Sequence, residues 1–135
     1  MAKNNKNNSA ACACGASPVL IFSCSGGADT GELADQAARE MTRQGIGRMF
    51  CLAGIGGKVS GIVASAKAAS SILVIDGCSL DCAKKNLEIE GITEFEHICL
   101  SDLGFEKGRS PVSEKGIERV VSAGRKLLQK EKVKV

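Results

Sequence analysis

The sequence predicts a small doubly wound α/β domain, flavodoxin-like or Rossmann-like, with a parallel sheet of about four strands. Four apolar runs have the length of strands, and they are Val19–Cys24, Met49–Ala53, Ile72–Ile75 and His97–Leu100. Between and after these runs lie longer stretches in which apolar residues recur every three or four positions, as in amphipathic helices. Strands that alternate with helices favour parallel pairing, with helices on both faces of the sheet.

Capping residues set the expected limits of the helices. Asp29 or Thr30 is expected to cap the first helix. The later helices are expected over 59–66, from Ser79 to Gly91, and from the Ser110-Pro111 pair onward. Right-handed crossovers between these elements make 2-1-3-4 the simplest strand order.

Length and composition fit one domain over residues 17–130. The chain has 135 residues, 44% of them apolar and 24% charged, and a chain of this size can bury a core without disulfides. Residues 1–16 are polar and Asn-rich, which predicts a flexible arm, and residues 131–135 form a basic tail. We find no apolar run of the ~20 residues that a membrane span needs and no secretory signal, so we expect a cytoplasmic protein. With four Phe and no Trp or Tyr, binding of nucleic acids by base stacking is disfavoured.

The seven cysteines carry the strongest functional signal. Cys24, Cys51 and Cys78 each lie near the carboxyl end of a predicted strand, where open α/β sheets bind ligands. In the order 2-1-3 these strands are neighbours about 4.8 Å apart, and thiolates that share one Zn²⁺ lie just under ~4 Å from each other. Cys82 follows Cys78 by one helical turn, so its sulfur can return to the same crevice. The sequence therefore predicts a thiolate metal site made by Cys24, Cys51, Cys78 and Cys82, with Zn²⁺ as the expected ion.

Other uses of the cysteines stay open. Four thiolates suit an iron–sulfur cluster as well as zinc. A thiol redox enzyme could use Cys78 and Cys82 as its exchanging pair, or Cys24 as a nucleophile at a helix start. Cys51 could lie too deep in its strand to reach a metal, and free cysteines such as Cys99 are often buried core residues. The basic carboxyl-terminal segment could bind an acidic partner, although a solvated helix end is the simpler interpretation.

The remaining polar candidates have simpler roles. Cys12 and Cys14 are expected to be an untethered thiol pair in the arm. His97, the single histidine, lies within the fourth strand pattern and is expected to be structural. Asp76 either orients a thiolate or accepts helix N–H groups, whereas Asp81 is expected to interact with the helix dipole. Three cations near predicted strand ends could offset the negative charge of a tetrathiolate site, and they are Lys58, Lys107 and Arg109.

The segment Val74–Lys85, which contains Asp76-Gly77-Cys78, resembles the signature of the DGC-domain family, named for this Asp-Gly-Cys motif. Phe22–Gly26, Leu52–Gly57 and Asp102–Phe105 are similar to other segments typical of the family, and the resemblance spans roughly residues 12–130. It implies a zinc-binding protein with four chelating cysteines, which correspond here to Cys24, Cys51, Cys78 and Cys82. It implies no particular enzymatic activity.

Overall fold

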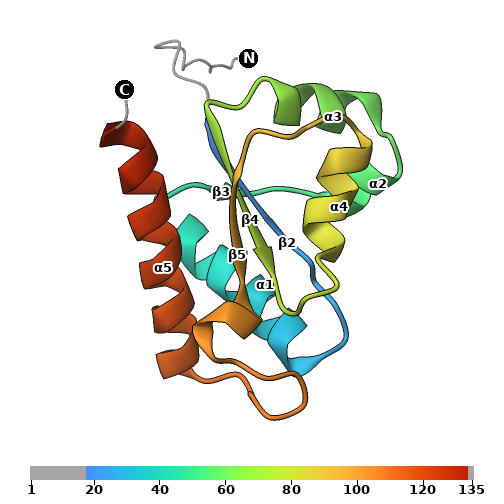
Figure 1. The fold of residues 1–135 in the computed structure, drawn as a ribbon. Coiled ribbons are helices and arrows are strands. Elements are labelled where there is room, and N and C mark those ends of the chain that lie inside the picture. Colours follow the sequence, from blue (N-terminus) through green and yellow to red (C-terminus); the bar gives the residue numbers. More distant parts are fainter. Residues whose placement is uncertain (1–17, 134–135) are drawn as a thin grey trace, which may run out of the picture.

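The computed structural model describes residues 18–133, which contain a four-stranded parallel sheet. Its strands are β2 (Val19–Ser23), β3 (Arg48–Met49), β4 (Ser71–Asp76) and β5 (Glu96–Cys99). They lie in the order β3-β2-β4-β5 (Figure 1). Numbered along the chain this is 2-1-3-4, so the predicted α/β class and strand order are confirmed.

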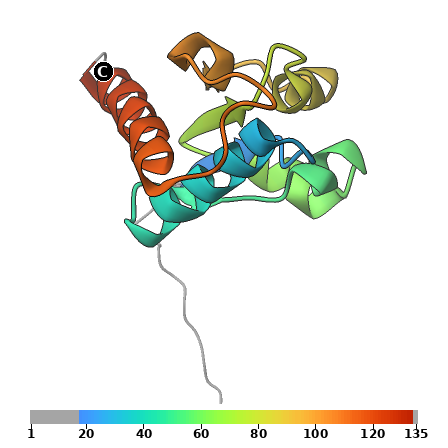
Figure 2. The same ribbon diagram turned by 90° about the horizontal axis from the view of Figure 1, so that it is seen from below.

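Helices cover both faces of the sheet, as predicted (Figure 2). One face carries α1 (Asp29–Arg43) and α5 (Glu114–Val133). The other face carries α2 (Leu52–Gly56), α3 (Ser60–Lys67) and α4 (Cys82–Ile89). A 3-10 helix, η2 (Leu100–Leu103), follows β5. The sheet is therefore the middle layer of three.

The two central strands, β2 and β4, are buried on both of their faces. In β2, Ile21 packs into the core on the side of α1 and α5, whereas Leu20 and Phe22 pack into the core on the opposite side. In β4, Leu73 and Val74 divide between the two cores in the same way. Burial on both faces explains why the sequences of these strands are continuous apolar runs instead of alternating ones.

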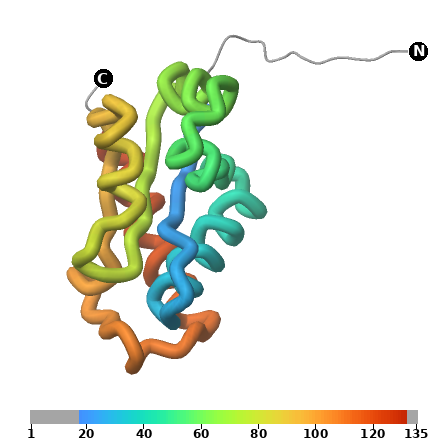
Figure 3. Tube along the Cα trace, turned by 90° about the vertical axis from the view of Figure 1, so that its right-hand side faces the viewer, coloured from blue at the N-terminus to red at the C-terminus, as the bar shows by residue number. Residues whose placement is uncertain are grey.

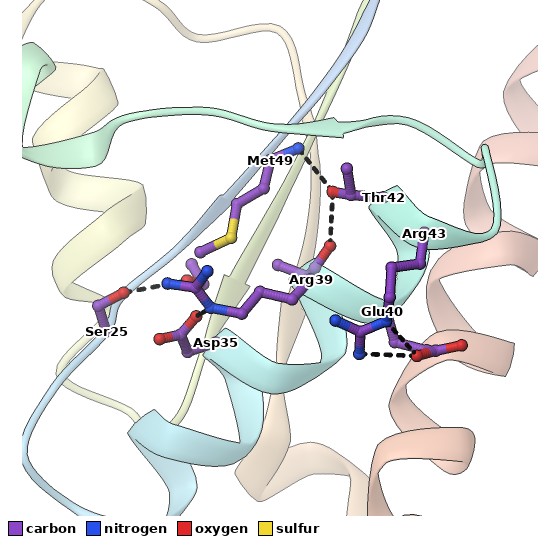
Figure 4. A network of polar contacts seen from close by, with 9 residues as sticks. Ser25, Asp35, Arg39, Glu40, Thr42, Arg43 and Met49 are labelled. Atoms are coloured by element: carbon purple, nitrogen blue, oxygen red, sulfur yellow. Dashed lines mark hydrogen bonds and ion pairs between the residues drawn. The ribbon is translucent and has the colours of Figure 1, made fainter.

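The second strand is shorter than its apolar run, Met49–Ala53, predicts. Only Arg48 and Met49 pair with β2, and the chain then leaves the sheet at Cys51 to begin α2. The backbone N–H of Met49 donates to Thr42 Oγ1 of α1 at 2.8 Å, which ties this edge strand to the helix (Figure 4). The predicted strand is too long because the run joins the end of a strand to the start of a helix, and both segments are apolar.

Three predicted helix starts also need correction. The residue before α1 is Ala28, which makes no side-chain cap, instead of Asp29 or Thr30. α4 starts at Cys82 and not at Ser79, because residues 78–81 form a turn that ends with Asp81 in the left-handed region (φ 56°, ψ 43°). α5 starts at Glu114, where Ser113 Oγ accepts the N–H of Gly116 at 3.0 Å, and not at the Ser110-Pro111 pair.

Two predicted segments lie wholly or partly beyond the described residues. The predicted arm, with Cys12 and Cys14, falls outside them. Helix α5 continues to Val133, into the range 131–135 that was expected to be a basic tail. Within residues 18–133, no helix combines the length and the apolar character that crossing a bilayer would require.

Candidate metal centre

Three of the four predicted ligands lie just beyond the carboxyl ends of adjacent strands. Cys51, Cys24 and Cys78 follow β3, β2 and β4 respectively, and these strands are neighbours in the sheet. The loops after β2 and β4 lie side by side at one end of the molecule (Figures 1 and 3). Cys82 is the first residue of α4, which begins directly after the second of these loops.

Two hydrogen bonds hold Cys24 against the end of β4 and the Asp-Gly-Cys loop. Its backbone N–H donates to the carbonyl of Ile75 at 3.1 Å, which prolongs the β2–β4 pairing by one residue. Its Sγ accepts the N–H of Gly77 at 3.3 Å. The Cys24 side chain is half-buried and packs against both cores, so it lies at the rim where the two layers meet. Since Cys78 is the next residue after Gly77, Cys24 and Cys78 lie at the same rim.

A close approach of backbones makes this arrangement dependent on glycine. A Cβ at Gly77 would lie 2.7 Å from the carbonyl carbon of Thr30, at the start of α1. A Cβ at Gly31 would lie 2.8 Å from the backbone nitrogen of Gly26, in the loop that follows Cys24. Both loops are therefore pressed onto the first turn of α1, and a side chain at either glycine would separate them.

Cys51 and Cys82 lie at the starts of two helices that pack together. Cys51 caps α2, because its Sγ accepts the N–H of Gly54 at 3.3 Å. A Cβ at Gly56 of α2 would lie 2.9 Å from Asn86 Oδ1 of α4. The two helices therefore approach each other closely at Gly56 and Asn86. Both thiol side chains are exposed.

The cysteine sulfurs do not meet as a group in the described part of the chain. Within it, the group of three or more His, Cys, Asp or Glu ligand atoms close enough to hold one metal ion consists of Asp76, Asp81 and His97, whose atoms all lie within 4.8 Å of one another. Cys99 is buried (8% exposed), as expected for a core residue. The structure thus gathers the four predicted cysteines at one edge of the sheet and brings a different set of ligand atoms into closer proximity.

The carboxylate of Asp76 is almost fully buried (1% exposed) and has three hydrogen-bond partners. Its Oδ1 accepts the N–H of Ala83 at 2.8 Å, and its Oδ2 accepts the N–H of Lys84 at 3.1 Å. Asp76 therefore caps α4 from the end of β4, which confirms one of its two predicted roles. Its Oδ2 also lies 2.9 Å from Nε2 of His97.

The pairing of Asp76 with His97 was missed from the sequence. In the β4–β5 register Val74 lies opposite His97 and Asp76 lies opposite Cys99. Because side chains alternate between the faces of a sheet, His97 lies on the same face as Asp76. The available signal was the single histidine, which lies two positions before Cys99, the residue that pairs with Asp76. Using that signal requires the exact strand register. Asp81, expected to interact with the helix dipole, makes no side-chain cap and lies 3.7 Å from His97 Nε2.

The cations expected to offset thiolate charge are partly engaged elsewhere. Lys58 pairs with Glu90, the residue that directly follows α4, and Arg109 lies 3.9 Å from Glu106 on the surface. The segment that carries Arg109 is anchored to α1, because Asp29 accepts the N–H groups of Gly108 and Ser110, each at 2.9 Å. These two bonds hold the pKa of the Asp29 carboxyl below its usual value, and the bond from Gly108 has the larger effect.

The fold and the order of the motifs together define an α/β protein with an Asp-Gly-Cys loop at the carboxyl edge of its parallel sheet. The chain matches the DGC domain over residues 20–123 and belongs to the DGC-domain family. It is also 35% identical over 88 residues to the anaerobic and virulence modulator AnvM of Pseudomonas aeruginosa, a match that covers 65% of this chain and 67% of that protein. No solved structure matches the chain.

Proposed function

We propose that this protein binds a metal ion through cysteine thiolates at the carboxyl edge of its sheet, with Zn²⁺ as the ion. The proposed ligands are Cys24, Cys51, Cys78 and Cys82. Family membership and the similarity to AnvM indicate a small regulatory or metal-binding protein. The thiolate ligand set is the finer proposal, and it rests on the geometry of the rim.

The observation that carries the proposal is the hydrogen bond from Gly77 N–H to Cys24 Sγ. It joins residues 53 positions apart in the sequence and brings the first predicted ligand to the loop that contains the third. Backbone N–H donors directed at sulfur also stabilise a thiolate, which is the form that binds metal. The N–H of Gly54 is directed at Cys51 Sγ in the same way.

The donor set at the rim fits a soft-ligand site. Cys51 and Cys82 are exposed and Cys24 and Cys78 are half-buried, so all four residues have accessible surface through which an ion can approach from solvent. Four thiolates around Zn²⁺ form a closed, stabilising site, whereas three leave a position open for a water molecule or another ligand. The relative AnvM is named as a modulator, which supports a closed site in a regulatory protein over a site of turnover.

Two alternatives use the same residues. An iron–sulfur cluster would need the same four thiolates. A redox role would use Cys78 and Cys82, which would form a disulfide by giving two electrons and two protons to an oxidising disulfide such as oxidised glutathione. The three residues between these two cysteines, instead of two, weigh against this role.

The test is metal analysis of the full chain purified without oxygen, with its visible spectrum. The proposal expects a colourless protein with about one Zn²⁺ bound through thiolates and the loss of that ion in Cys24→Ser and Cys78→Ser. Cys99→Ala, which removes a buried thiol that is not one of the proposed ligands, is the matched control and should keep it. A brown, iron-containing sample would favour the cluster. Unchanged zinc in both serine variants would refute the proposed ligands.

A further inference from the structure

We propose that Asp76, Asp81 and His97 form a second divalent-cation site, distinct from the cysteines, for an ion that accepts nitrogen and oxygen ligands. The three residues come from the end of β4, the turn before α4, and β5. The inference does not depend on the proposed thiolate site, and either site can exist without the other.

The spacing of the donor atoms suits one small ion. Nε2 of His97 lies 2.9 Å from Asp76 Oδ2 and 3.7 Å from Asp81 Oδ1, and all three atoms lie within 4.8 Å of one another. Ligand atoms about 2.1 Å from a shared ion lie roughly 3.0–3.5 Å from each other. Shifts of a few tenths of an ångström at His97, and a somewhat larger turn of the Asp81 side chain, would therefore suffice.

The charge of the cluster favours a cation. Two carboxylates share this small volume, and that of Asp76 is 1% exposed. Among residues 18–131, neither carboxylate forms an ion pair with a Lys or Arg side chain, and both face His97. The α4 N–H donors of Ala83 and Lys84 serve Asp76 alone. The hydrogen bonds of Asp76 come from neutral backbone N–H groups and from His97, so they add no Lys or Arg charge, and a divalent ion would neutralise both carboxylates at once.

Access and donor type indicate the class of ion. The side chains of Asp81 and His97 are 27% and 21% exposed, so an ion can enter from the solvent side. Three protein ligands leave positions for water. Imidazole together with carboxylates suits Zn²⁺, Mn²⁺ or Fe²⁺ better than a soft ion that requires sulfur. Binding through Nε2 requires that His97 carry its proton on Nδ1.

Asp81→Asn is the informative variant. Asn adopts the left-handed conformation more readily than most residues, so the backbone at Asp81 (φ 56°) is preserved while the negative ligand is lost. Asp102→Asn removes an exposed carboxylate of η2 and is the matched control. His97→Gln removes the imidazole, and thermal unfolding without metal will show whether each variant is folded.

The experiment is a Co²⁺ titration of the metal-depleted full chain, followed by calorimetry and absorption. Sulfur-to-cobalt charge transfer reports the thiolate site, whereas a nitrogen and oxygen site gives heat and only weak visible bands. We expect one equivalent of Co²⁺ to bind without a charge-transfer band. The affinity for this equivalent should fall at least ~10-fold in Asp81→Asn and in His97→Gln, and it should be unchanged in Asp102→Asn.

The two proposals fail in different ways in this titration. The absence of charge transfer from every sample would refute the thiolate site and leave the second site standing. Equal stoichiometry and affinity in wild type and Asp81→Asn would overturn the second site. The second site would also be overturned if Asp81→Asn lost only the charge-transfer signal of the thiolate site and kept the other Co²⁺ equivalent.

Discussion

Replacing Asp76 by Asn tests the buried carboxylate on which both the Asp-Gly-Cys loop and α4 depend. The carboxylate accepts hydrogen bonds from Ala83 and Lys84 and lies within hydrogen-bond distance of His97 Nε2. Asn keeps one oxygen, which can still accept from Ala83. Its NH₂ group then faces the N–H of Lys84, so that donor loses its partner, while His97 can adapt by accepting through its other tautomer.

The expected cost follows from these contacts. A hydrogen bond to a charged group contributes about 1.5–3 kcal/mol, and a buried donor left unsatisfied costs about 1–3 kcal/mol. We therefore expect Asp76→Asn to lower the free energy of unfolding by roughly 3 kcal/mol. For a domain of this size that corresponds to a fall in Tm of about 12 °C, at ~4 °C per kcal/mol.

Thermal and urea unfolding of both proteins in a chelating buffer measures this effect without any contribution from metal binding. Asp102→Asn, an exposed carboxylate, should change the unfolding free energy by less than ~0.5 kcal/mol. A loss below about 1 kcal/mol in Asp76→Asn would contradict the reasoning, since it would mean that the carboxylate does not cap α4 in solution.

Three further outcomes follow from the described contacts. Gly77→Ala should destabilise the fold by about 1–3 kcal/mol in urea unfolding, because its Cβ would collide with Thr30, whereas Gly61→Ala, which meets nothing within 4 Å, should not destabilise it. The lowered pKa of Asp29 gives stability that is present above its unfolded pKa, near ~3.9, and lost as pH falls through the folded value. Asp29→Asn should therefore flatten the dependence of the urea midpoint on pH below about 4, and an unchanged slope would contradict this. Ser113→Ala should cost about 1 kcal/mol through loss of the α5 cap, and equal Tm values would refute the cap.

Element types were predictable because they depend on local pattern, and strand order because general topology rules restrict it. Ile72–Ile75 is apolar and β-branched at both ends, which is typical of a strand buried on both faces. Alternation of such runs with helical spacing leaves few topologies once crossovers are right-handed. The flavodoxin-like order 2-1-3-4 was the simplest of these topologies, and it is the order that the structure has.

Element ends were harder to predict because tertiary contacts decide them. Ser79 was expected to cap α4. The helix N–H of Ala83 instead donates to Asp76, which lies seven residues earlier in the chain. The strand ending at Met49 and the helix starting at Leu52 share one apolar run, and periodicity over so short a run cannot separate them.

The candidate site was predictable in its position and not in its closest contacts. Strand ends indicated the edge where Cys24 and Cys78 lie. The three-residue cluster required the β4–β5 register, which sets His97 on the face of Asp76, and the left-handed turn at Asp81. Neither feature has a local sequence signature strong enough to be read without the fold.

X-ray absorption at the zinc edge tests the central claim most directly, namely that thiolates at the rim bind the metal. The sample is the full-length Asp81→Asn variant loaded with one equivalent of Zn²⁺, so that the second site does not contribute. The proposal predicts a shell of sulfur neighbours near ~2.3 Å. A spectrum with only nitrogen and oxygen neighbours at ~2.0–2.1 Å would contradict it.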